Sequence, residues 1–276
     1  MKTILEGNKI IKEAIENSLP FIAGKMGAVE QQVMIYKLAG KKWDDSLRWH
    51  ASNHAGITPP TDVILDFFTN VYEKSLRNLD LLTIWFPDNL NSNEFAISNY
   101  YCGKSQFISG LQALEPFYHV NPWSYALKGK KVLVIHPFED SIKEQYSKKE
   151  LLFEDKTILP DFELITLKTH QTHGGGNTDL PWDVCYSDMS EKIMKTDFDV
   201  ALVGCGAYGL PLCDVVKNMG KPAIHVGGGL QIMFGIKGNR WDNMPAVYKY
   251  YNEHWKRPFD SEKTRNHNIV EGSTYW

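Results

Sequence analysis

Short apolar runs separated by longer amphipathic segments organise most of this chain. Each run is three to eight residues long and is bounded by turn residues, which is typical of strands buried inside a sheet. Runs of this kind occupy residues 21–23, 79–86, 106–109, 132–136, 162–167, 200–203 and 223–226. The sequence therefore predicts a series of short strands along nearly its whole length.

The segments between these runs carry apolar residues at helical spacing. Residues 61–76 are the clearest case, because Thr61 stands at the N-cap position before an apolar stripe that includes Val63, Ile64, Phe67 and Phe68. Further helices are predicted over residues 9–17, 28–38, 94–100 and 182–194, and one begins at Ser141.

Alternation of strands and helices predicts an α/β fold. We expect a Rossmann-like, mostly parallel sheet with helices on both faces. The chain shows neither an internal repeat nor a long linker, so residues 1–276 are interpreted as one elaborated domain. Residues 242–276 form an irregular C-terminal extension, and the apolar pair Tyr275 and Trp276 predicts that it docks on the body or across a dimer partner.

Two glycine-rich turns follow two successive strands. Gly204, Gly206 and Gly209 form a Gly-x-Gly-x-x-Gly turn after residues 200–203, and residues 227–229 are three glycines after residues 223–226. Carboxyl ends of parallel strands meet at one sheet edge, where ligands bind in open α/β folds. Backbone N–H groups at a helix N-terminus bind anions there. The hypothesis is a phosphate-bearing ligand at this edge.

Other polar residues are expected at the same edge. His136 ends the strand 132–136, and it and Ser141 are candidates to hydrogen-bond a phosphate or sugar, although Ser141 is equally well explained as a helix N-cap. Lys237 and Arg240 supply positive charge beside the glycine turns, or else form a solvated surface pair.

Glu30 is the candidate carboxylate. Residues 24–27 form a predicted tight turn after the first strand, and Glu30 falls in the first turn of the helix 28–38. A carboxylate at that position is favoured by the helix dipole, so Glu30 is interpreted either as a cap or as a group aimed at a metal or a sugar hydroxyl.

Two loops are also candidates for ligand contact. Residues 43–60 are predicted to be irregular, with Asn53 and Gly56 arguing against a helix around His50 and His54, and their aromatic side chains suit a sugar or base contact or a packed flap. Residues 169–179 form a second predicted loop, whose His170 and His173 either bind metal or face solvent.

Composition narrows the class of protein. The formal net charge is −3, which provides no overall attraction for nucleic acid or anionic lipid. The four cysteines lack metal-binding spacing and are predicted to be buried free thiols in a reducing compartment. The first residues do not resemble a signal peptide and no apolar run is long enough to span a membrane, so we expect a cytoplasmic protein.

Three functions are compatible with these residues. A dinucleotide-dependent oxidoreductase needs an acidic residue after the second strand to hold the ribose, but His225 occupies that region. A nucleotide-sugar transferase needs N–H donors and cations for the diphosphate, together with a carboxylate. A non-catalytic sugar- or nucleotide-binding module uses the same groups without turnover.

Two sequence blocks carry a resemblance to known proteins. Residues 21–30, FIAGKMGAVE, resemble the N-terminal signature of glycosyltransferases of the GT-D fold, an Arg-Phe-Gly-Asp-Gly-Glu-like segment after the first strand. Residues 204–212, with 227–231 and 234–241, resemble poorly characterised bacterial proteins associated with surface-polysaccharide synthesis. That second resemblance extends from Leu114 to the end of the chain.

The resemblance implies a GT-D-like sheet and a nucleotide-sugar site. Gly27 and Glu30 match the motif's glycine and final glutamate, Lys25 lies close to its arginine, and Ala28 replaces the aspartate of its Asp-x-Glu pair. The resemblance thus implies that Glu30 is the catalytic residue and the one ligand of Mn²⁺ or Mg²⁺. The missing aspartate weakens the expectation that the reaction requires a metal ion.

The implied partners are a nucleotide-sugar donor and a glycan or lipid-linked glycan acceptor, with a possible homodimer and at most peripheral membrane association. Nucleic acid is not expected. The residues expected to bind the donor are Gly24, Lys25, Gly27, His136, Ser141, Gly204, Gly206, Tyr208, Gly227, Gly228, Lys237 and Arg240.

Overall fold

The computed structural model describes residues 1–176 and 178–276. Its centre is one seven-stranded sheet with the order β3-β2-β1-β7-β6-β4-β5, and every strand pairing in it is parallel. The Rossmann-like α/β fold expected from the sequence is confirmed. The strands are β1 (Phe21–Gly24), β2 (Leu81–Ile84), β3 (Gln106–Ser109), β4 (Lys131–His136), β5 (Glu163–Lys168), β6 (Val200–Val203) and β7 (Pro222–His225).

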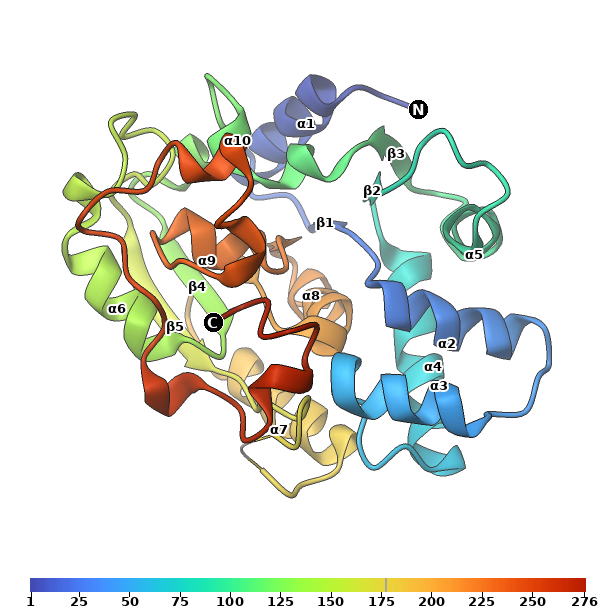
Figure 1. The fold of residues 1–276 in the computed structure, drawn as a ribbon. Coiled ribbons are helices and arrows are strands. Elements are labelled where there is room, and N and C mark those ends of the chain that lie inside the picture. Colours follow the sequence, from blue (N-terminus) through green and yellow to red (C-terminus); the bar gives the residue numbers. More distant parts are fainter. Residues whose placement is uncertain (177) are drawn as a thin grey trace.

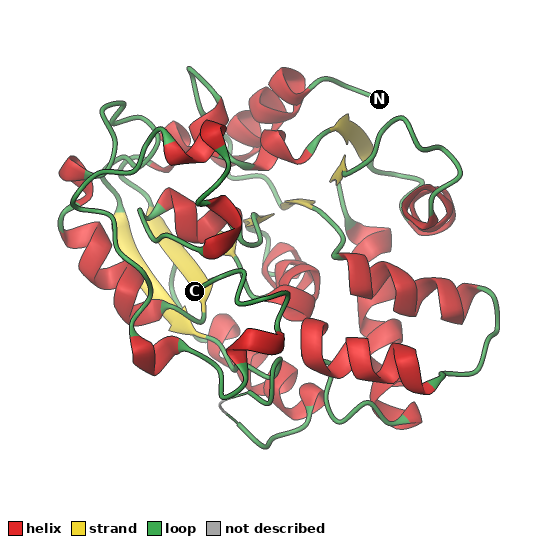
Figure 2. Ribbon diagram, in the orientation of Figure 1, coloured by secondary structure: helices red, strands yellow, loops and turns green. Residues whose placement is uncertain are grey.

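Helices cover both faces of the sheet (Figures 1 and 2). Side chains from α2, α4, α5, α7 and α8 belong to the hydrophobic core on one face, and side chains from α1, α6, α9 and α10 belong to the core on the other. The helices are α1 (Ile4–Glu16), α2 (Ala28–Leu38), α3 (Asp45–His50), α4 (Asp62–Asn78), α5 (Asn93–Tyr101), α6 (Glu139–Ser147), α7 (Trp182–Met194), α8 (Gly209–Asn218), α9 (Gly229–Met233) and α10 (Pro245–Tyr248).

Local capping explains why the predicted helices begin where they do. Thr61 is the N-cap of α4, and its hydroxyl accepts a hydrogen bond from the N–H of Ile64 at 3.3 Å. The buried face of α4 is nevertheless rotated from the predicted stripe, since Val63 is 75% exposed while Leu65 and Tyr72 are buried. Contacts with α7 and α8 decide this rotation, which the helical period alone leaves open.

The prediction that residues 43–60 are irregular is wrong for residues 45–55, which are helical, and is confirmed for residues 43–44 and 56–60. Asp44 caps α3 by accepting from the N–H of Leu47 at 2.8 Å, and a π-helix, Ala51–Ala55, continues it directly. The side chain of Asn53 donates to the carbonyl of Trp49 at 3.0 Å instead of breaking the helix, and Gly56, with φ of 75°, ends it.

The C-terminal segment packs on the body of its own chain. It contains α10 and two short 3₁₀ turns, Asp260–Glu262 and His267–Ile269, and its last residue, Trp276, is 5% exposed. Figure 1 shows this red segment, which contacts the loop before α7 through Asn266 and Arg265 and ends beside α9.

Two further expectations concern the cysteines and the membrane. All four cysteines are free and buried, as predicted. Among the described helices, none has the length and apolar character needed to cross a bilayer.

Candidate functional site

The chain leaves the neighbouring strands β1 and β7 toward opposite faces of the sheet. β1 is followed by α2, whose Val33 and Met34 belong to one core, whereas β7 is followed by α9, whose Leu230 and Ile232 belong to the other. This divergence opens a crevice outside the carboxyl ends of neighbouring strands, the place where ligands bind in open α/β sheets.

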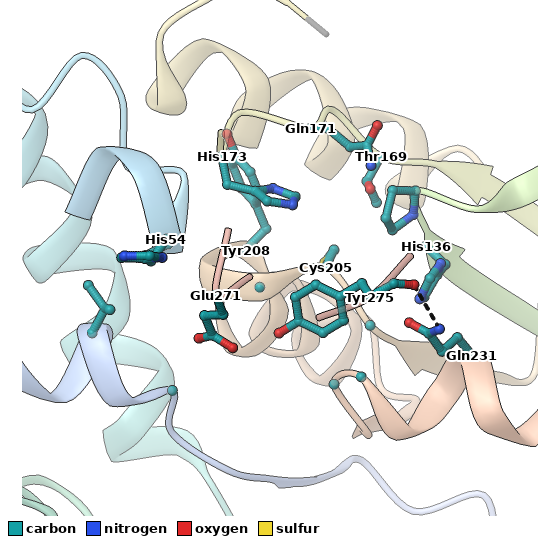
Figure 3. Close-up of a pocket in the computed structure, with 18 of the residues that line it drawn as sticks. His54, His136, Thr169, Gln171, His173, Cys205, Tyr208, Gln231, Glu271 and Tyr275 are labelled. Atoms are coloured by element: carbon teal, nitrogen blue, oxygen red, sulfur yellow. Dashed lines mark hydrogen bonds between the residues drawn. The ribbon is translucent and has the colours of Figure 1, made fainter. Parts of the chain in front are cut away.

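A pocket with a volume of about 130 Å³ lies in this crevice (Figure 3). Its walls come from the segment after β1, the π-helix, the loops after β2, β4, β5, β6 and β7, and the C-terminal segment. The residues that line it include Lys25, Gly27, Glu30, His54, Trp85, His136, Thr169, Gly204, Gly206, Tyr208, His225, Gly227, Gly228, Gln231, Arg240, Glu271, Tyr275 and Trp276.

The first glycine turn has steric reasons for its glycines. Gly206 has φ of 56°, a left-handed conformation that side chains disfavour, and a Cβ on Gly209 would lie 2.0 Å from Cε1 of His225. The N–H of Gly204 donates to the carbonyl of Ile135 at 3.0 Å and is unavailable to a ligand. The N–H of Gly206 opens the helical segment that leads into α8, so no preceding turn satisfies it.

In the second glycine turn, too, one N–H group bonds to a neighbouring strand and another begins a helical turn. Gly227 has φ of 65°, and its N–H donates to the carbonyl of Val203 at 3.2 Å. Gly228 is the N-cap of α9 and begins a helical turn. The prediction that all four backbone groups bind a diphosphate is therefore wrong for the N–H groups of Gly204 and Gly227, because neighbouring strands use them. For Gly206 and Gly228, which stand at the start of helical turns, binding of a diphosphate stays a prediction.

Lys25 supplies a cation beside the second turn. Its Nζ lies 4.5 Å from the centre of the Trp85 ring, and a Cβ on Gly227 would meet its Cε at 2.6 Å and its Nζ at 3.2 Å. Burial lowers the pKa of the Lys25 ammonium, and the Glu30 charge opposes that shift. A compact, partly buried cation is thereby held directly after β1.

The Glu30 carboxylate folds back over the start of its own helix. It is 8% exposed, and its Oε2 would lie 2.1 Å from a Cβ on Gly27, the N-cap of α2. Only glycine leaves room for it there. Burial raises the pKa of Glu30, while its own backbone N–H and the Lys25 charge act in the opposite direction. This position suits both predicted roles, a helix cap and a pocket carboxylate.

Arg240 reaches the pocket and Lys237 does not. The Arg240 guanidinium pairs with Glu271, and its Nε donates to the hydroxyl of Thr274 at 3.1 Å. Lys237 instead places its Nζ 5.2 Å from the centre of the Tyr251 ring, outside the lining. Of the two predicted cations beside the glycine turns, Arg240 alone lines the cavity, and Lys25 takes the second place.

Ser141 and Gly24 are also outside the lining. The Ser141 hydroxyl donates to Glu262, whose carboxylate accepts as well from the N–H groups of Asp140 at 2.9 Å and Ser141 at 3.1 Å. The chain's own Glu262 carboxylate thus takes the place of the phosphate or sugar predicted to bind Ser141. Ser141 is the third residue of α6 and not its N-cap. Gly24 lies within β1, where a Cβ would meet Leu210 at 2.6 Å.

Tyr208 lines the cavity, but most of its side chain is buried in the hydrophobic core. Its ring stacks on Trp182 at 4.9 Å between centroids, and its hydroxyl lies 3.0 Å from that of Thr172. Burial raises the pKa of this phenol well above its ordinary value.

Two buried histidines contribute uncharged polar atoms. Burial lowers the pKa of both His136 and His225 to about 3, so their rings are neutral at physiological pH. The N–H of Phe138 donates to Nδ1 of His136 at 3.0 Å. His225 lies where the sequence lacks the ribose-binding acid of a dinucleotide site, and its ring packs on Gly209.

Metal ligands do not gather at this pocket. Over residues 1–176 and 178–276, no group of three His, Cys, Asp or Glu side chains could hold an ion. The charge nearest Glu30 is that of Lys25, and Glu271 is engaged by Arg240. This set of donor groups does not fit Mn²⁺ or Mg²⁺.

The residues that close the pocket come from segments that the sequence singles out only as segments. His54 in the π-helix and Thr169 after β5 belong to the two loops predicted as candidates for ligand contact. Glu271, Tyr275 and Trp276 come from the C-terminal segment, which is predicted to dock and not to line a site. Trp276 stacks on His173 at 5.9 Å between ring centroids, which explains the apolar end of that segment. Residues 169–179 were predicted to be a loop, and Asn177 within them lies outside the described residues.

Comparison of the chain with models of protein families, with curated proteins and with solved structures finds no match.

Proposed function

We propose that this protein is a glycosyltransferase-like enzyme that transfers a sugar from a nucleotide-sugar donor to a glycan acceptor in surface-polysaccharide synthesis. One observation carries the proposal. Two cations, Lys25 and Arg240, line the same strand-end pocket as the helix starts at Gly206 and Gly228 and the buried carboxylate Glu30. The resemblance of residues 21–30 to the GT-D signature points to the same chemistry.

Each group has a role in this reaction. The bond between the sugar's anomeric carbon and the donor phosphate breaks, and a bond to the acceptor oxygen forms. Lys25, Arg240 and the free N–H groups stabilise the charge that develops on the departing diphosphate. Glu30 accepts the proton of the acceptor hydroxyl, a role that a raised pKa favours because it makes the carboxylate a stronger base.

The size of the cavity sets a condition on this proposal. Its volume of about 130 Å³ is smaller than the roughly 300–1,000 Å³ of pockets that enclose a drug-sized ligand. A nucleotide-sugar must therefore extend out of the pocket or displace the covering residues Glu271, Tyr275 and Trp276.

A binding module without turnover is the second candidate. It is favoured by the position of the Glu30 carboxylate over Gly27, which a purely structural helix cap would also adopt. Under this alternative the donor binds with the same groups, and replacement of Glu30 affects stability alone.

Thermal shift with UDP-glucose, GDP-mannose, CMP-sialic acid, dTDP-rhamnose and NAD, each with and without Mn²⁺, tests donor binding. A ligand at 100 times its dissociation constant stabilises by about 2.7 kcal/mol. Stabilisation by NAD alone would refute the transferase proposal. A nucleotide-sugar that binds without hydrolysis or transfer to any acceptor offered would favour the module.

Glu30→Gln then separates catalysis from capping, and Glu6→Gln is its matched control. Glu6 occupies the same third position of α1 and reaches back to its N-cap Thr3. We expect E30Q to lose at least 100-fold in transfer rate with a melting temperature close to that of E6Q. If E30Q keeps its activity and loses stability as E6Q does, Glu30 is only a cap.

A further inference from the structure

The end of the pocket next to β4 and α9 is lined by uncharged polar groups, in contrast to the charged end around Lys25 and Arg240. Its members are His136 at the end of β4, Thr169 after β5 and Gln231 in α9. Figure 3 shows Gln231 and His136 close together, with Thr169 on the far side of His136. Their side chains are all more than nine-tenths buried.

The amide of Gln231 has a fixed orientation. Its Nε2 donates toward the carbonyls of Ile236 at 3.3 Å, Lys237 at 3.2 Å and Tyr275 at 3.1 Å. Three acceptors on one side require the nitrogen there, so Oε1 is turned into the pocket (Figure 3). Gln231 is 0% exposed, and within the described part of the chain its Oε1 has no hydrogen-bond partner. Such an orphaned acceptor costs about 1–3 kcal/mol.

His136 provides the complementary donor. Its Nδ1 accepts the N–H of Phe138 at 3.0 Å, so in the neutral ring Nε2 carries the proton. The Cδ2 atom next to Nε2 is the atom that a Cβ on Gly204 would meet, at 2.7 Å. The edge of the ring that carries the N–H therefore faces the glycine turn at the floor of the pocket.

A buried acceptor beside a neutral donor matches a hydroxyl, which donates and accepts at once. A phosphate oxygen only accepts, so Gln231 Oε1 would repel it, and an uncharged imidazole offers no compensating charge. The hydroxyl of Thr169 adds a third group without a partner in the described chain. Phosphate is thus favoured at the Lys25 and Arg240 end and disfavoured at this end.

We propose that His136, Gln231 and Thr169 form a subsite that binds the hydroxyl groups of a sugar, and that this subsite distinguishes a nucleotide-sugar from the nucleoside diphosphate alone. The identification of that sugar as the donor's hexose rests on the proposed function. The placement of hydroxyls beside Gln231 and His136 rests on the orphaned acceptor and the fixed ring.

Two substitutions of His136 divide its functions. His136→Asn keeps an acceptor at the Nδ1 position for the Phe138 N–H and removes the Nε2 donor. His136→Gln keeps a donor at the Nε2 position and loses the acceptor. The matched control is His119→Gln, because His119 is also buried, bonds the Gln112 carbonyl through Nε2 at 2.8 Å and lies outside the pocket.

Calorimetry with UDP-glucose, GDP-mannose, UDP and GDP measures the effect. We expect H136N to bind the accepted nucleotide-sugar about tenfold more weakly, the loss of one hydrogen bond, with unchanged affinity for the nucleoside diphosphate. H136Q should keep the preference for the sugar and lose stability, and H119Q should match the parent. Equal weakening of both ligands in H136N would overturn the inference, since His136 would then contact phosphate or base.

A second measurement is independent of the donor. Nitrogen NMR of the His136 ring with glucose, mannose or galactose at 100 mM should show a shift of the Nε2–H signal in the parent protein, and H136N identifies that signal by its loss. If no nucleotide-sugar binds but a monosaccharide shifts the signal, the proposed function fails and the subsite stands. If neither nucleotide-sugars nor monosaccharides affect His136, the subsite itself is refuted.

Discussion

Glu262 holds the C-terminal segment against the start of α6, and its removal should loosen the cover of the pocket. Its carboxylate is 0% exposed and accepts from the N–H groups of Asp140, Ser141 and Phe259 at 2.9–3.1 Å, and from the Ser141 hydroxyl. The chain's own carboxylate thus occupies an anion site at a helix N-terminus. Glu262→Ala removes all of these acceptor atoms at once.

The magnitude follows from these hydrogen bonds. A hydrogen bond to a charged group contributes about 1.5–3 kcal/mol net, but the N–H groups in the first turn of α6 become hydrated when the segment detaches. We therefore expect a loss of about 3 kcal/mol in the free energy of unfolding. For a chain of this size each kcal/mol lowers the melting temperature by about 2 °C, so E262A should melt about 6 °C lower.

Calorimetry and hydrogen exchange check this prediction together. The carbonyl of Glu262 also accepts from Gln171 at 3.0 Å and from the indole of Trp276 at 3.3 Å, so exchange should accelerate across residues 262–276 in E262A. The control is Asp260→Ala, two residues away, whose side chain is 95% exposed and which should change stability by less than about 0.5 kcal/mol. A melting temperature within 1 °C of the parent, with unchanged hydrogen exchange, would refute the conclusion that Glu262 holds the C-terminal segment against α6.

Two further predictions concern the packing and charge state of the pocket. Gly209→Ala forces a Cβ against the His225 ring and should lower the free energy of unfolding, measured by urea denaturation, by about 2 kcal/mol. The control Gly103→Ala has open space around the new Cβ and should leave stability unchanged. Equal stability of the two variants would show that the His225 ring moves aside freely. His136 has a folded-state pKa of about 3 against about 6.5 when unfolded, so the unfolded state binds the proton first and stability falls as pH drops through 6.5 toward 3. At pH 5 this group costs about 2 kcal/mol, and H136N should lose that much less stability than the parent between pH 7 and pH 5. Identical pH dependence of H136N and the parent in urea denaturation would contradict the buried neutral ring.

Much of the fold was predictable because its signals are local. The apolar run Val200–Val203 and the helix Trp182–Met194 have the predicted bounds, and the Thr61 cap forms as expected. Two strands followed by glycine turns were enough to predict one shared edge, because parallel neighbours must end together. The helix over residues 45–55 was missed because Asn53 bonds back to Trp49, which a propensity argument does not anticipate.

The sequence by itself determined the α/β class, the position of the glycine turns and the presence of Glu30 at the start of a helix, since each depends on residues a few positions apart. Tertiary structure decided which of these groups are free to bind a ligand. β4 and β6 consume the N–H groups of Gly204 and Gly227, and Glu262, 121 residues away along the chain, fills the anion site at Ser141. Segments far apart in the sequence hydrogen-bond to the same backbone groups. Only the folded structure therefore shows which N–H groups and side chains remain free to bind a ligand.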